Sequence, residues 1–544
     1  MSEAIKCPLE MFYQWEKETP NKVFLRQPKQ LEWTEYTWAQ TADQVRRIAS
    51  FLTSKNYPKG SHIGIWSGNS KDWPIVDLAI MLSGHVSVPL YPGQDTKSAN
   101  YIFTHSGTRL IFAGVFDQAA NMQAAINEDI EVVGMLGCTA KCQTTLEDIV
   151  ATYEPMTESP IPNPDDIFTI LYTSGTTGNP KGVMHMHQTP GHVVPALAKK
   201  FHTYDEGSEL FSFLPMAHVA ERAIVEFNGL YTNSPISFSE GLATFGDELR
   251  SVQPTFFFAV PRLWVKFKQA IDAAIPPAAQ AGLTDEQRKG IAAKLGLSRA
   301  RMVITGSAPC SKDVQNWFLG MGIALRDCYG MTENFVHGMG WIHTDEPVSG
   351  CVGVLFDDKA QVRISDSGEI QFKSKGMMTG YYKEPEKTAE VFDNGWYRTG
   401  DAGRFDEDGN LWITGRISEV FKSTKGKFIA PTDIEQKFSR SNELAQLCVL
   451  GHGMDQPVLL ATLSETGNTL DEETLSSKLQ SLLDEVNAEL SPWQKVQFIG
   501  ITPEWTIDNL LLTPTLKIKR KDIEQTYIDQ IKAHTGSDTV AILK

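Results

Sequence analysis

The amino-acid sequence predicts an α/β fold of layered sheets and helices. Short apolar runs lie at 61–68, 85–91, 109–114 and 165–173, and three of them end at Gly or Thr. Longer helical patterns lie between them, for example at 73–84, and another lies at 37–55. This alternation is typical of mainly parallel sheets covered by helices. In such folds the strand ends carry the ligand site, so we expect the functional residues to follow the apolar runs.

The pattern changes between 395 and 430. Turn signals at Asn394-Gly395, Thr399-Gly400-Asp401 and Asp408-Gly409-Asn410 predict hairpins of short strands. Enough residues follow Arg416 to form a small domain of their own. We therefore expect a large N-terminal domain of residues 1–416 and a small C-terminal domain of residues 417–544.

The composition is that of an ordinary globular protein. Of the 544 residues, 41% are hydrophobic and 21% are charged, which excludes collagen-like, wholly disordered and coiled-coil proteins. The formal net charge of −16 repels a polyanion at long range and argues against binding to nucleic acid. Local clusters of basic residues must therefore meet any phosphate-rich ligand.

Three features indicate a cytoplasmic protein without a transmembrane segment. The seven cysteines are an odd number and thinly spread, which is typical of reduced thiols. The first sixteen residues contain three Glu and no apolar stretch of signal-peptide length. The most apolar long window, 73–91, is interrupted by Asp77 and His85, which favours a buried helix and strand over a membrane span. Peripheral contact with a membrane surface is compatible with this pattern.

A loop rich in glycine and hydroxyl groups follows the run 165–173. It reads Thr173-Ser174-Gly175-Thr176-Thr177-Gly178-Asn179-Pro180-Lys181-Gly182. Its glycines let backbone N–H groups approach an anion, its hydroxyls can donate to phosphate oxygens, and Lys181 adds positive charge. A plain Gly-Thr turn is the alternative. The spacing excludes the G-x-x-x-x-G-K-[ST] loop of nucleoside triphosphatases, so we interpret the segment as a different kind of nucleotide loop.

A series of segments resembles the adenylate-forming superfamily of acyl-CoA synthetases, adenylation domains and luciferases. The loop closed by Pro180-Lys181-Gly182 resembles the signature of that superfamily. The other segments follow in family order at Gly306-Ser307-Ala308-Pro309, Tyr329-Gly330-Met331-Thr332-Glu333, Gly380-Tyr381-Tyr382-Lys383-Glu384-Pro385-Glu386, Tyr397-Arg398-Thr399-Gly400-Asp401, Gly415-Arg416 and Thr515-Leu516-Lys517-Ile518-Lys519-Arg520. The resemblance implies a large N-terminal domain of layered sheets and helices with a small, mobile C-terminal α+β domain.

Members of this superfamily activate a carboxylic acid, which is a poor electrophile by itself. The carboxylate attacks the α-phosphate of ATP to give an acyl-adenylate and pyrophosphate, and a thiol then displaces AMP. Because two anions must meet, the site needs positive charge and a metal ion. The resemblance therefore implies ATP, Mg²⁺ and coenzyme A as ligands.

The resemblance implies catalytic roles for Lys517, Glu333 and Thr332. Glu333 and the hydroxyl of Thr173 would hold Mg²⁺, with Thr332 beside Glu333. Lys517 would bridge the substrate carboxylate and the α-phosphate during adenylation, and the Lys-Ile-x-Arg spacing favours it over Lys519. For the basic run alone, a solvated surface segment is the alternative.

The resemblance also implies which residues bind the nucleotide. They are Thr173, Ser174, Gly175, Thr176, Thr177, Lys181, Gly306, Ser307, Ala308, Tyr329, Gly330, Thr332, Asp401, Arg416 and Lys517. Residues 176, 177 and 181 would hold the β- and γ-phosphates, while Tyr329 would stack on adenine opposite 306–308. Asp401, reinforced by Arg416, would accept hydrogen bonds from the ribose hydroxyls.

In this superfamily the C-terminal domain swings about a hinge that follows Gly-Arg, so one site adenylates and then accepts the thiol. The hinge position here is Ser418, where relatives commonly carry Asp or Lys. A hinge needs only permissive backbone torsions, so we still expect the C-terminal domain to rotate here. Because Ser418 is uncharged, we do not expect a charged hinge residue to hold either orientation. The lysine-rich segment 422–427 would turn toward the thiol donor and suits the phosphates of coenzyme A, with an exposed turn as the alternative.

The segments 88–92, 214–222 and 256–264 resemble the long-chain fatty-acid branch of the superfamily. A tunnel for an alkyl chain requires an apolar lining, because each methylene buried there contributes about 0.8 kcal/mol of binding free energy. For the aromatic run 256–258 an ordinary buried strand is the alternative. We expect His218 near the tunnel mouth, as a gate or a neighbour of the carboxylate.

Three histidines, His185, His187 and His192, superficially resemble a metal cluster. The i, i+2 spacing of the first two suits a strand, and no Cys or carboxylate accompanies them. We therefore expect His185 and His187 to be packing residues beside the phosphate loop.

The sequence thus predicts a cytoplasmic long-chain fatty acid:CoA ligase that converts ATP, fatty acid and coenzyme A into acyl-CoA, AMP and pyrophosphate. Three alternatives stay open: a CoA ligase for medium-chain or aryl carboxylates, a fatty acyl-AMP ligase, and a non-catalytic relative that binds nucleotide or lipid. The joint presence of Lys181, Glu333, Asp401, Arg416 and Lys517 argues against the non-catalytic alternative.

Overall fold

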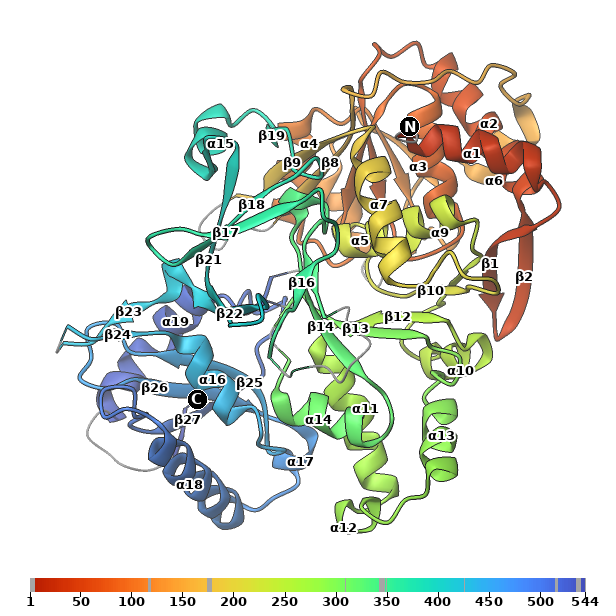
Figure 1. Ribbon diagram of the computed structural model, residues 1–544. Helices are drawn as coiled ribbons and strands as arrows, with labels where there is room; N and C mark the ends of the chain where they lie inside the picture. The colour runs from red at the N-terminus through yellow and green to blue at the C-terminus, as the bar shows by residue number, and fades with distance from the viewer. Residues whose placement is uncertain are drawn as a thin grey trace.

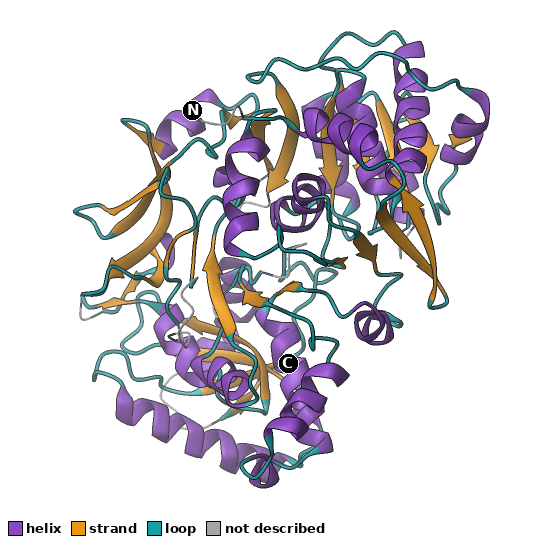
Figure 2. Cartoon of the chain, turned by 45° about the vertical axis from the view of Figure 1, so that its right-hand side comes forward, coloured by secondary structure: helices purple, strands orange, loops and turns teal. Residues whose placement is uncertain are grey.

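The computed structural model describes residues 5–115, 119–173, 179–308, 310–341, 348, 350–424, 426–513, 517–534 and 540–543. Figure 1 shows a large part, coloured red to cyan, and a smaller part in blue that contains the end of the chain. Sheets and helices alternate along the large part in layers (Figure 2), so the predicted α/β class is confirmed.

The central sheet of the large part has eight strands in the order β19-β9-β8-β4-β3-β5-β6-β7. Their bounds are β3 (His62–Trp66), β4 (Val86–Leu90), β5 (Leu110–Ala113), β6 (Glu131–Gly134), β7 (Thr144–Thr145), β8 (Ile167–Thr173), β9 (Lys181–Met186) and β19 (Gly380–Tyr381). The strands from β8 to β7 are parallel, whereas β9 and β19 run antiparallel to their neighbours. β3, β4, β5 and β8 coincide with the apolar runs of the sequence.

Three smaller sheets complete the large part. One contains β10 (Leu210–Ser212), β11 (Ile236–Phe238), β1 (Val23–Lys29) and β2 (Glu32–Thr37). Another contains β12 (Phe256–Ala259), β13 (Met302–Thr305), β14 (Leu325–Tyr329), β15 (Met339–Gly340) and β16 (Val354–Leu355). The last contains β17 (Gln361–Ile364), β18 (Glu369–Lys373), β21 (Trp396–Phe405) and β20 (Phe392–Asp393), with β22 (Leu411–Arg416) paired to β21.

Helices cover these sheets. They are α1 (Pro8–Glu18), α2 (Trp38–Ser54), α3 (Asp72–Leu82), α4 (Thr96–Ser106), α5 (Ala119–Ala125), α6 (Leu146–Thr152), α7 (Thr189–Lys200), α8 (Val219–Glu221), the π-helix η1 (Arg222–Glu226), α9 (Phe227–Thr232), α10 (Phe245–Val252), α11 (Pro261–Ala274), α12 (Pro277–Gln280), α13 (Asp285–Lys294), α14 (Lys312–Gly320), the 3-10 helix η2 (Thr332–Asn334) and α15 (Pro385–Val391). A capping box starts α2, because Thr37 Oγ1 accepts from the Gln40 N–H at 3.3 Å and the Gln40 side chain accepts from the Thr37 N–H at 2.9 Å.

Helix α3 occupies the most apolar window of the sequence and is buried along its whole length. In the described residues, no helix is both long enough and apolar enough to cross a membrane. The charge inside α3 is paired: Arg222 Nη2 lies 2.5 Å from Asp77 Oδ2. The same guanidinium donates to Thr169 Oγ1 on β8 at 2.7 Å and lies 3.2 Å from Glu226 Oε2. This buried network ties α3 and the π-helix to the strand that leads into the phosphate loop.

The aromatic run on β12 fills the core. Phe256 stacks on Phe201 with ring centroids 4.7 Å apart, and Phe257 contacts Trp264 edge-to-face at 5.6 Å. All three phenylalanines of β12, including Phe258, are buried in hydrophobic clusters. The structure therefore supports the ordinary buried strand that the sequence left open as an alternative to a tunnel wall.

The smaller part has its own sheet and its own hydrophobic core. The sheet runs β25 (Leu444–Leu450), β26 (Val458–Leu463), β27 (Ile499–Thr502) and β28 (Ala541–Ile542), and β23 (Phe421–Lys422) pairs with β24 (Phe428–Ile429). The helices are η3 (Ile417–Glu419), α16 (Pro431–Phe438), α17 (Glu465–Asn468), α18 (Glu472–Glu489) and α19 (Arg520–His534). Two hydrophobic clusters consist only of residues beyond 420.

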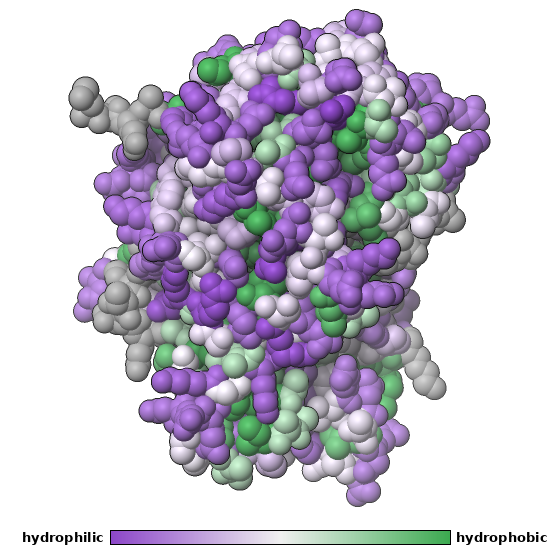
Figure 3. Space-filling view, turned by 90° about the vertical axis from the view of Figure 1, so that its right-hand side faces the viewer, coloured by the Kyte–Doolittle hydropathy of each residue, from purple (hydrophilic) through white to green (hydrophobic). Residues whose placement is uncertain are grey.

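On the face in Figure 3, hydrophobic side chains form small separate patches among hydrophilic ones.

Candidate active site

The two ends of the predicted phosphate loop lie opposite each other at the end of β8. β8 ends at Thr173, β9 begins at Lys181, and the strand register pairs these two residues. The Thr173 hydroxyl donates to the Lys181 carbonyl at 3.5 Å. The predicted contacts Ser174, Gly175, Thr176 and Thr177 lie outside the described residues. The structure thus defines where the loop leaves the sheet and where it returns.

Glu333 lies in η2, which follows β14. The Nε2–H of His185, on β9, donates to the Thr332 carbonyl at 2.7 Å, and the Met378 N–H donates to the Glu333 carbonyl at 2.7 Å. Burial lowers the pKa of His185 to about 4, so its imidazole is neutral. These bonds hold the short helix that carries Glu333 against the central sheet.

One tyrosine lies between Glu333 and the phosphate loop. Tyr381 Oη donates to Glu333 Oε1 at 3.0 Å, and Lys181 Nζ lies 5.0 Å from the centre of the Tyr381 ring. The motif that contains Tyr381 predicts no separate role for this residue. A role for Tyr381 becomes visible only in the folded structure, because Lys181 and Glu333 approach it from distant parts of the chain.

The segments expected to enclose adenine leave neighbouring parallel strands at the same end. Gly306 follows β13, and Tyr329 closes β14, which pairs with β13. Glycine at 306 avoids a close contact, because a Cβ there would lie 2.7 Å from Cys328 Sγ and 3.0 Å from the Cys328 carbonyl oxygen. Ser307 has a left-handed backbone with φ of 68°, and both Ser307 and Ala308 are exposed. The segment can therefore present its backbone and small side chains to a flat ligand beside Tyr329.

Asp401 is the centre of a buried hydrogen-bonded group. It pairs with Arg416 across β21 and β22, and Arg416 Nε lies 2.8 Å from Asp401 Oδ1. Tyr329 Oη donates to Asp401 Oδ2 at 2.5 Å. Burial raises the pKa of Asp401, while Arg416 and Tyr329 oppose that rise. A carboxylate held in this way keeps lone pairs for further donors such as sugar hydroxyls.

Lys517 brings a positive charge from the smaller part of the chain to this group. Its backbone N–H donates to Thr513 Oγ1 at 3.0 Å. Desolvation by surrounding protein lowers the pKa of Lys517, Arg416 lowers it further, and Asp401 and Glu333 raise it. Lys517 retains exposed surface, so this desolvation comes from protein around the side chain rather than from full enclosure. The residues predicted to bind the ribose, the metal and the substrate carboxylate therefore influence one another through their charges.

His218 lies close enough to Lys517 to be affected by its charge. It caps α8, and its Nδ1 accepts from the Ala220 N–H at 3.2 Å, which leaves the proton on Nε2. Burial lowers the pKa of His218 to about 4, and Lys517 contributes to that shift. The Tyr91 ring lies 6.4 Å away between centroids. His218 is therefore a neutral N–H donor on which the charge of Lys517 acts, and its tunnel role stays a prediction.

The histidines near the loop are packing residues, as the sequence predicted. His187 is buried with its ring 5.7 Å from that of Phe168, and His185 lies 5.0 Å from Phe335. His192 Nε2 shares a 3.1 Å hydrogen bond with the Gln188 side chain. These contacts account for the three rings through packing and local hydrogen bonds.

The donors at the loop fit a magnesium ion that is shared with a nucleotide. Thr173 and Glu333 offer a hydroxyl and a carboxylate, and Mg²⁺ is usually bound by few protein oxygens together with phosphates and water. Over the described ranges, no group of three or more His, Cys, Asp or Glu residues could hold a metal by itself. A magnesium ion here would therefore depend on phosphate oxygens for much of its coordination.

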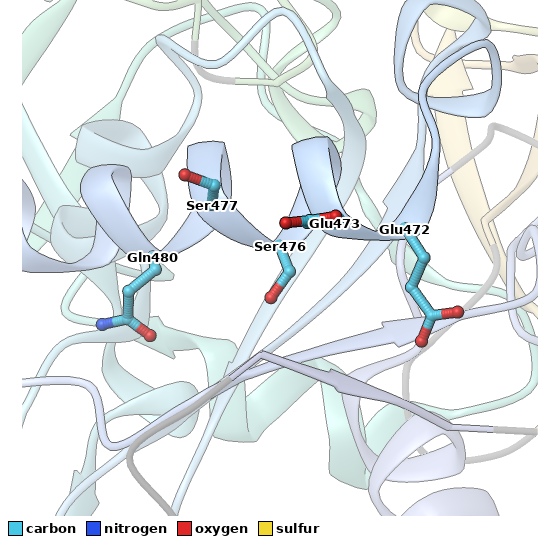
Figure 4. Close-up of a pocket in the computed structure, with 5 residues that line it drawn as sticks. All are labelled: Glu472, Glu473, Ser476, Ser477 and Gln480. Carbon is cyan, nitrogen blue, oxygen red and sulfur yellow. The ribbon is translucent and has the colours of Figure 1, made fainter.

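A hollow on the smaller part has a different character. It lies along α18 and is lined by Glu472, Glu473, Ser476, Ser477 and Gln480 (Figure 4). None of the predicted site residues is among them, and two carboxylates repel phosphates. This hollow does not suit ATP.

The chain belongs to the AMP-binding enzyme family. The model of that family matches residues 12–382, and a model of the AMP-binding enzyme C-terminal domain matches residues 419–536. The match covers most of the large part and most of the smaller part. The superfamily inferred from the motif series is therefore confirmed.

Among curated proteins, the chain is similar to long-chain-fatty-acid–CoA ligases. It is 26% identical to ligase FadD15 of Mycobacterium bovis, over 96% of this chain and 96% of that protein. It is 29% identical to long-chain-fatty-acid–CoA ligase 5 of Rattus norvegicus, over 93% of this chain and 85% of that protein. The similarity thus spans nearly the whole chain.

Among solved structures, the adenylation domain of the carboxylate reductase from Mycobacterium chelonae superposes with a TM-score of 0.81 at 21% identity, over 98% of this chain and 92% of that one. A benzoate CoA ligase from Burkholderia xenovorans gives a TM-score of 0.78 at 16% identity, over 95% of this chain and 99% of that one. At these identities the comparisons establish the fold.

Proposed function

We propose that this protein is an AMP-forming fatty acid:coenzyme A ligase that activates a long-chain fatty acid as an acyl-adenylate. The observation that carries the proposal is the arrangement of charged and hydrogen-bonded side chains at the strand ends: Arg416 Nε lies 2.8 Å from Asp401 Oδ1, and Tyr381 Oη donates to Glu333 Oε1 at 3.0 Å. The charges of Asp401 and Glu333 also act on Lys517, from the smaller part of the chain. The full-length similarity to proteins named long-chain-fatty-acid–CoA ligases supports the substrate class and the acceptor.

In the first half-reaction, a carboxylate oxygen attacks the α-phosphorus of ATP, and the bond to pyrophosphate breaks with its electron pair. The ammonium group of Lys517 would approach both reacting anions and reduce their repulsion. Lys181 would hold the terminal phosphates. Glu333 and Thr173 would hold a magnesium ion, which would supply positive charge beside those phosphates. Asp401 binds the ribose and so fixes the position of the α-phosphate.

In the second half-reaction, the thiol sulfur of coenzyme A attacks the acyl carbonyl carbon, AMP leaves, and the thiol proton is released to solvent. The hairpin β23–β24 supplies charge and aromatic surface for the coenzyme. Lys422 Nζ lies 4.7 Å from the Phe428 ring centre, and Lys427 Nζ lies 5.3 Å from that of Trp493. Exposed rings flanked by ammonium groups suit a phosphorylated purine.

The two half-reactions use two domains, residues 1–416 and 417–544, that rotate about Ser418. The separate hydrophobic clusters beyond 420 support this boundary. An exposed ion pair between the parts, with Arg262 Nη2 3.2 Å from Glu504 Oε1, is weak enough to break during rotation. Reduced thiols agree with a cytoplasmic location, because all seven cysteines are free.

Pyrophosphate release tests the proposed function. Purified full-length protein is incubated with ATP, Mg²⁺ and one acid from a panel of C8 to C20 fatty acids and benzoate, with and without coenzyme A. We expect release with palmitate, and acyl-CoA only when coenzyme A is present. Release only with benzoate would contradict the long-chain claim, acyl-AMP that coenzyme A does not consume would indicate an acyl-AMP ligase, and no release with any acid would reject catalysis.

A further inference from the structure

Tyr381 separates two side chains of opposite charge that the proposed function uses on the same phosphates. Its hydroxyl donates to Glu333 Oε1 at 3.0 Å, and its ring centre lies 5.0 Å from Lys181 Nζ. Tyr381 is 5% exposed, so both contacts are made where little water competes. The Tyr381 hydroxyl is the donor in this bond, because an ionised carboxylate only accepts hydrogen bonds.

Without a spacer, the Lys181 ammonium and the Glu333 carboxylate would attract each other. Such attraction is much stronger in a partly buried site than in water, and a direct ion pair would satisfy both charges. Lys181 would then be lost to the phosphates and a Glu333 oxygen would be lost to magnesium. An aromatic ring attracts the ammonium through its face, while its hydroxyl binds the carboxylate, so each charge stays available.

Tyr381 is itself held from several directions. Its backbone N–H donates to Thr388 Oγ1 at 2.9 Å, and the register of β19 with β9 places it opposite Val183. The Tyr397 hydroxyl lies 3.5 Å from the Tyr381 hydroxyl. The ring therefore has a defined position relative to the strand that begins with Lys181.

We propose that Tyr381 is a positioning residue that keeps Lys181 and Glu333 apart and aims both at the phosphates of magnesium-bound ATP. This inference rests on the proposed function, because it takes Lys181 and Glu333 as the groups that serve the phosphates and the metal. It adds a third residue, which acts through these two neighbours.

Calorimetric binding of an ATP analogue with an α,β-methylene bridge, titrated at a series of Mg²⁺ concentrations, tests this role in the full-length protein. Tyr381→Phe keeps the ring and loses the hydrogen bond to Glu333. We expect unchanged affinity without Mg²⁺ and about a tenfold higher Mg²⁺ concentration for half-maximal binding. Tyr381→Leu also removes the ring and should weaken analogue binding several-fold even without Mg²⁺.

Tyr382 provides the matched control. Its ring packs elsewhere, with centroids 5.1 Å from His62 and 5.6 Å from His105. Tyr382→Phe should therefore bind the analogue and Mg²⁺ like the wild type. Wild-type Mg²⁺ dependence in Tyr381→Phe, or an equal shift in Tyr382→Phe, would overturn the inference.

Melting temperatures identify any variant that has lost its fold, and Tyr381→Phe carries the test if Tyr381→Leu does not fold. Analogue binding needs no acid, so failure of fatty-acid activation would reject the proposed function and leave the binding result readable. Wild-type protein that binds no nucleotide would reject both.

Discussion

Lys517, in the smaller part of the chain, interacts electrostatically with charged residues of the large part. Desolvation and the nearby Arg416 lower its pKa, while Asp401 and Glu333 favour its charged form. Only the protonated side chain can stabilise two anions that approach each other. As the pH rises, adenylation should therefore begin to decline at a pH below the ordinary pKa of a lysine side chain.

Replacing Lys517 should separate the two half-reactions. Lys517→Ala should slow adenylate formation about 100-fold or more, because a charge aimed at the transition state is lost. Thioester formation from supplied acyl-AMP should survive. Acid-dependent exchange of labelled pyrophosphate into ATP measures the first step, and acyl-CoA formation measures the second. Lys519→Ala is the matched control, and a normal exchange rate in Lys517→Ala would refute the assignment.

Glu221 is a buried acid that follows His218 on α8. Ser212 Oγ donates to its Oε1 at 2.7 Å, and the Phe213 N–H donates to the same oxygen at 3.1 Å. Burial raises the pKa of Glu221 from 4.5 to about 8, although these hydrogen bonds oppose the rise. Between these pH values the folded protein holds a proton that the unfolded chain has released. The stability from this group is therefore present at acid pH and is lost as the pH rises toward about 8.

Glu221→Gln should flatten this pH dependence, because the amide cannot titrate. Relative to the variant, the wild-type free energy of unfolding should fall by up to about 1.4 kcal/mol for each pH unit across that window. Urea unfolding of both proteins at several pH values measures the difference. Glu473→Gln, at an exposed position on α18, controls for the loss of one carboxylate. A constant difference between Glu221→Gln and wild type across the window would contradict the buried-acid account.

At the scale of elements, two of the three turn signals in the sequence predict hairpins correctly. The third, Thr399-Gly400-Asp401, is wrong, because these residues lie inside strand β21 (Trp396–Phe405). Asn394 and Gly395 have φ values of 50° and 79°, as an Asn-Gly hairpin turn between β20 and β21 requires. The next hairpin places Asp401 opposite Arg416. The family resemblance predicts that Asp401 and Arg416 act together. The hydrogen bond from the Tyr329 hydroxyl to Asp401 could not be predicted, because the two residues belong to different sheets.

The hairpin β23–β24 should contribute to coenzyme A binding through its aromatic surface. Phe428 is 64% exposed, so its ring is accessible to a ligand. Phe428→Ala and Trp493→Ala should each raise the KM for coenzyme A about fivefold or more, because an aromatic platform for the adenine is lost. Pyrophosphate exchange should not change. Steady-state kinetics with varied coenzyme A measures the effect.

Pantetheine, which has the thiol arm without the nucleotide, separates adenine recognition from general damage. Its KM should be the same in wild type, Phe428→Ala and Trp493→Ala. Ile542→Ala, at a 55% exposed position on β28, is the control for loss of an exposed side chain. Equal losses with pantetheine and coenzyme A would show that these rings do not recognise the nucleotide.

On the scale of the whole molecule, the two parts have separate interiors. The described members of the cluster around the central sheet all precede residue 400, and those of the two C-terminal clusters all follow 420. Truncation after Arg416 should therefore leave a folded N-terminal domain that melts cooperatively, because little buried apolar surface is exposed. Differential scanning calorimetry of residues 1–416 measures this, with the full chain as control. A broad transition without cooperativity would place the boundary elsewhere.

The fold and the local motifs could be predicted because apolar periodicity and turn residues are local signals. Strands β3, β4, β5 and β8 and helices α2 and α3 follow such signals directly. The role of Tyr381 and the pairing of Asp77 with Arg222 could not, because each depends on how distant segments pack. The packing of the β12 phenylalanines into the core likewise depends on neighbours such as Phe201.

The central claim is that the carboxylate attacks the α-phosphate of ATP within a site shared by both parts of the chain. Palmitate labelled with ¹⁸O in its carboxylate tests it most directly, with mass spectrometry of the AMP formed alongside acyl-CoA. The account predicts AMP that carries one ¹⁸O atom in its phosphate, because the attacking oxygen stays with AMP when the thiol displaces it. Unlabelled AMP, with the ¹⁸O found in pyrophosphate or orthophosphate, would contradict it.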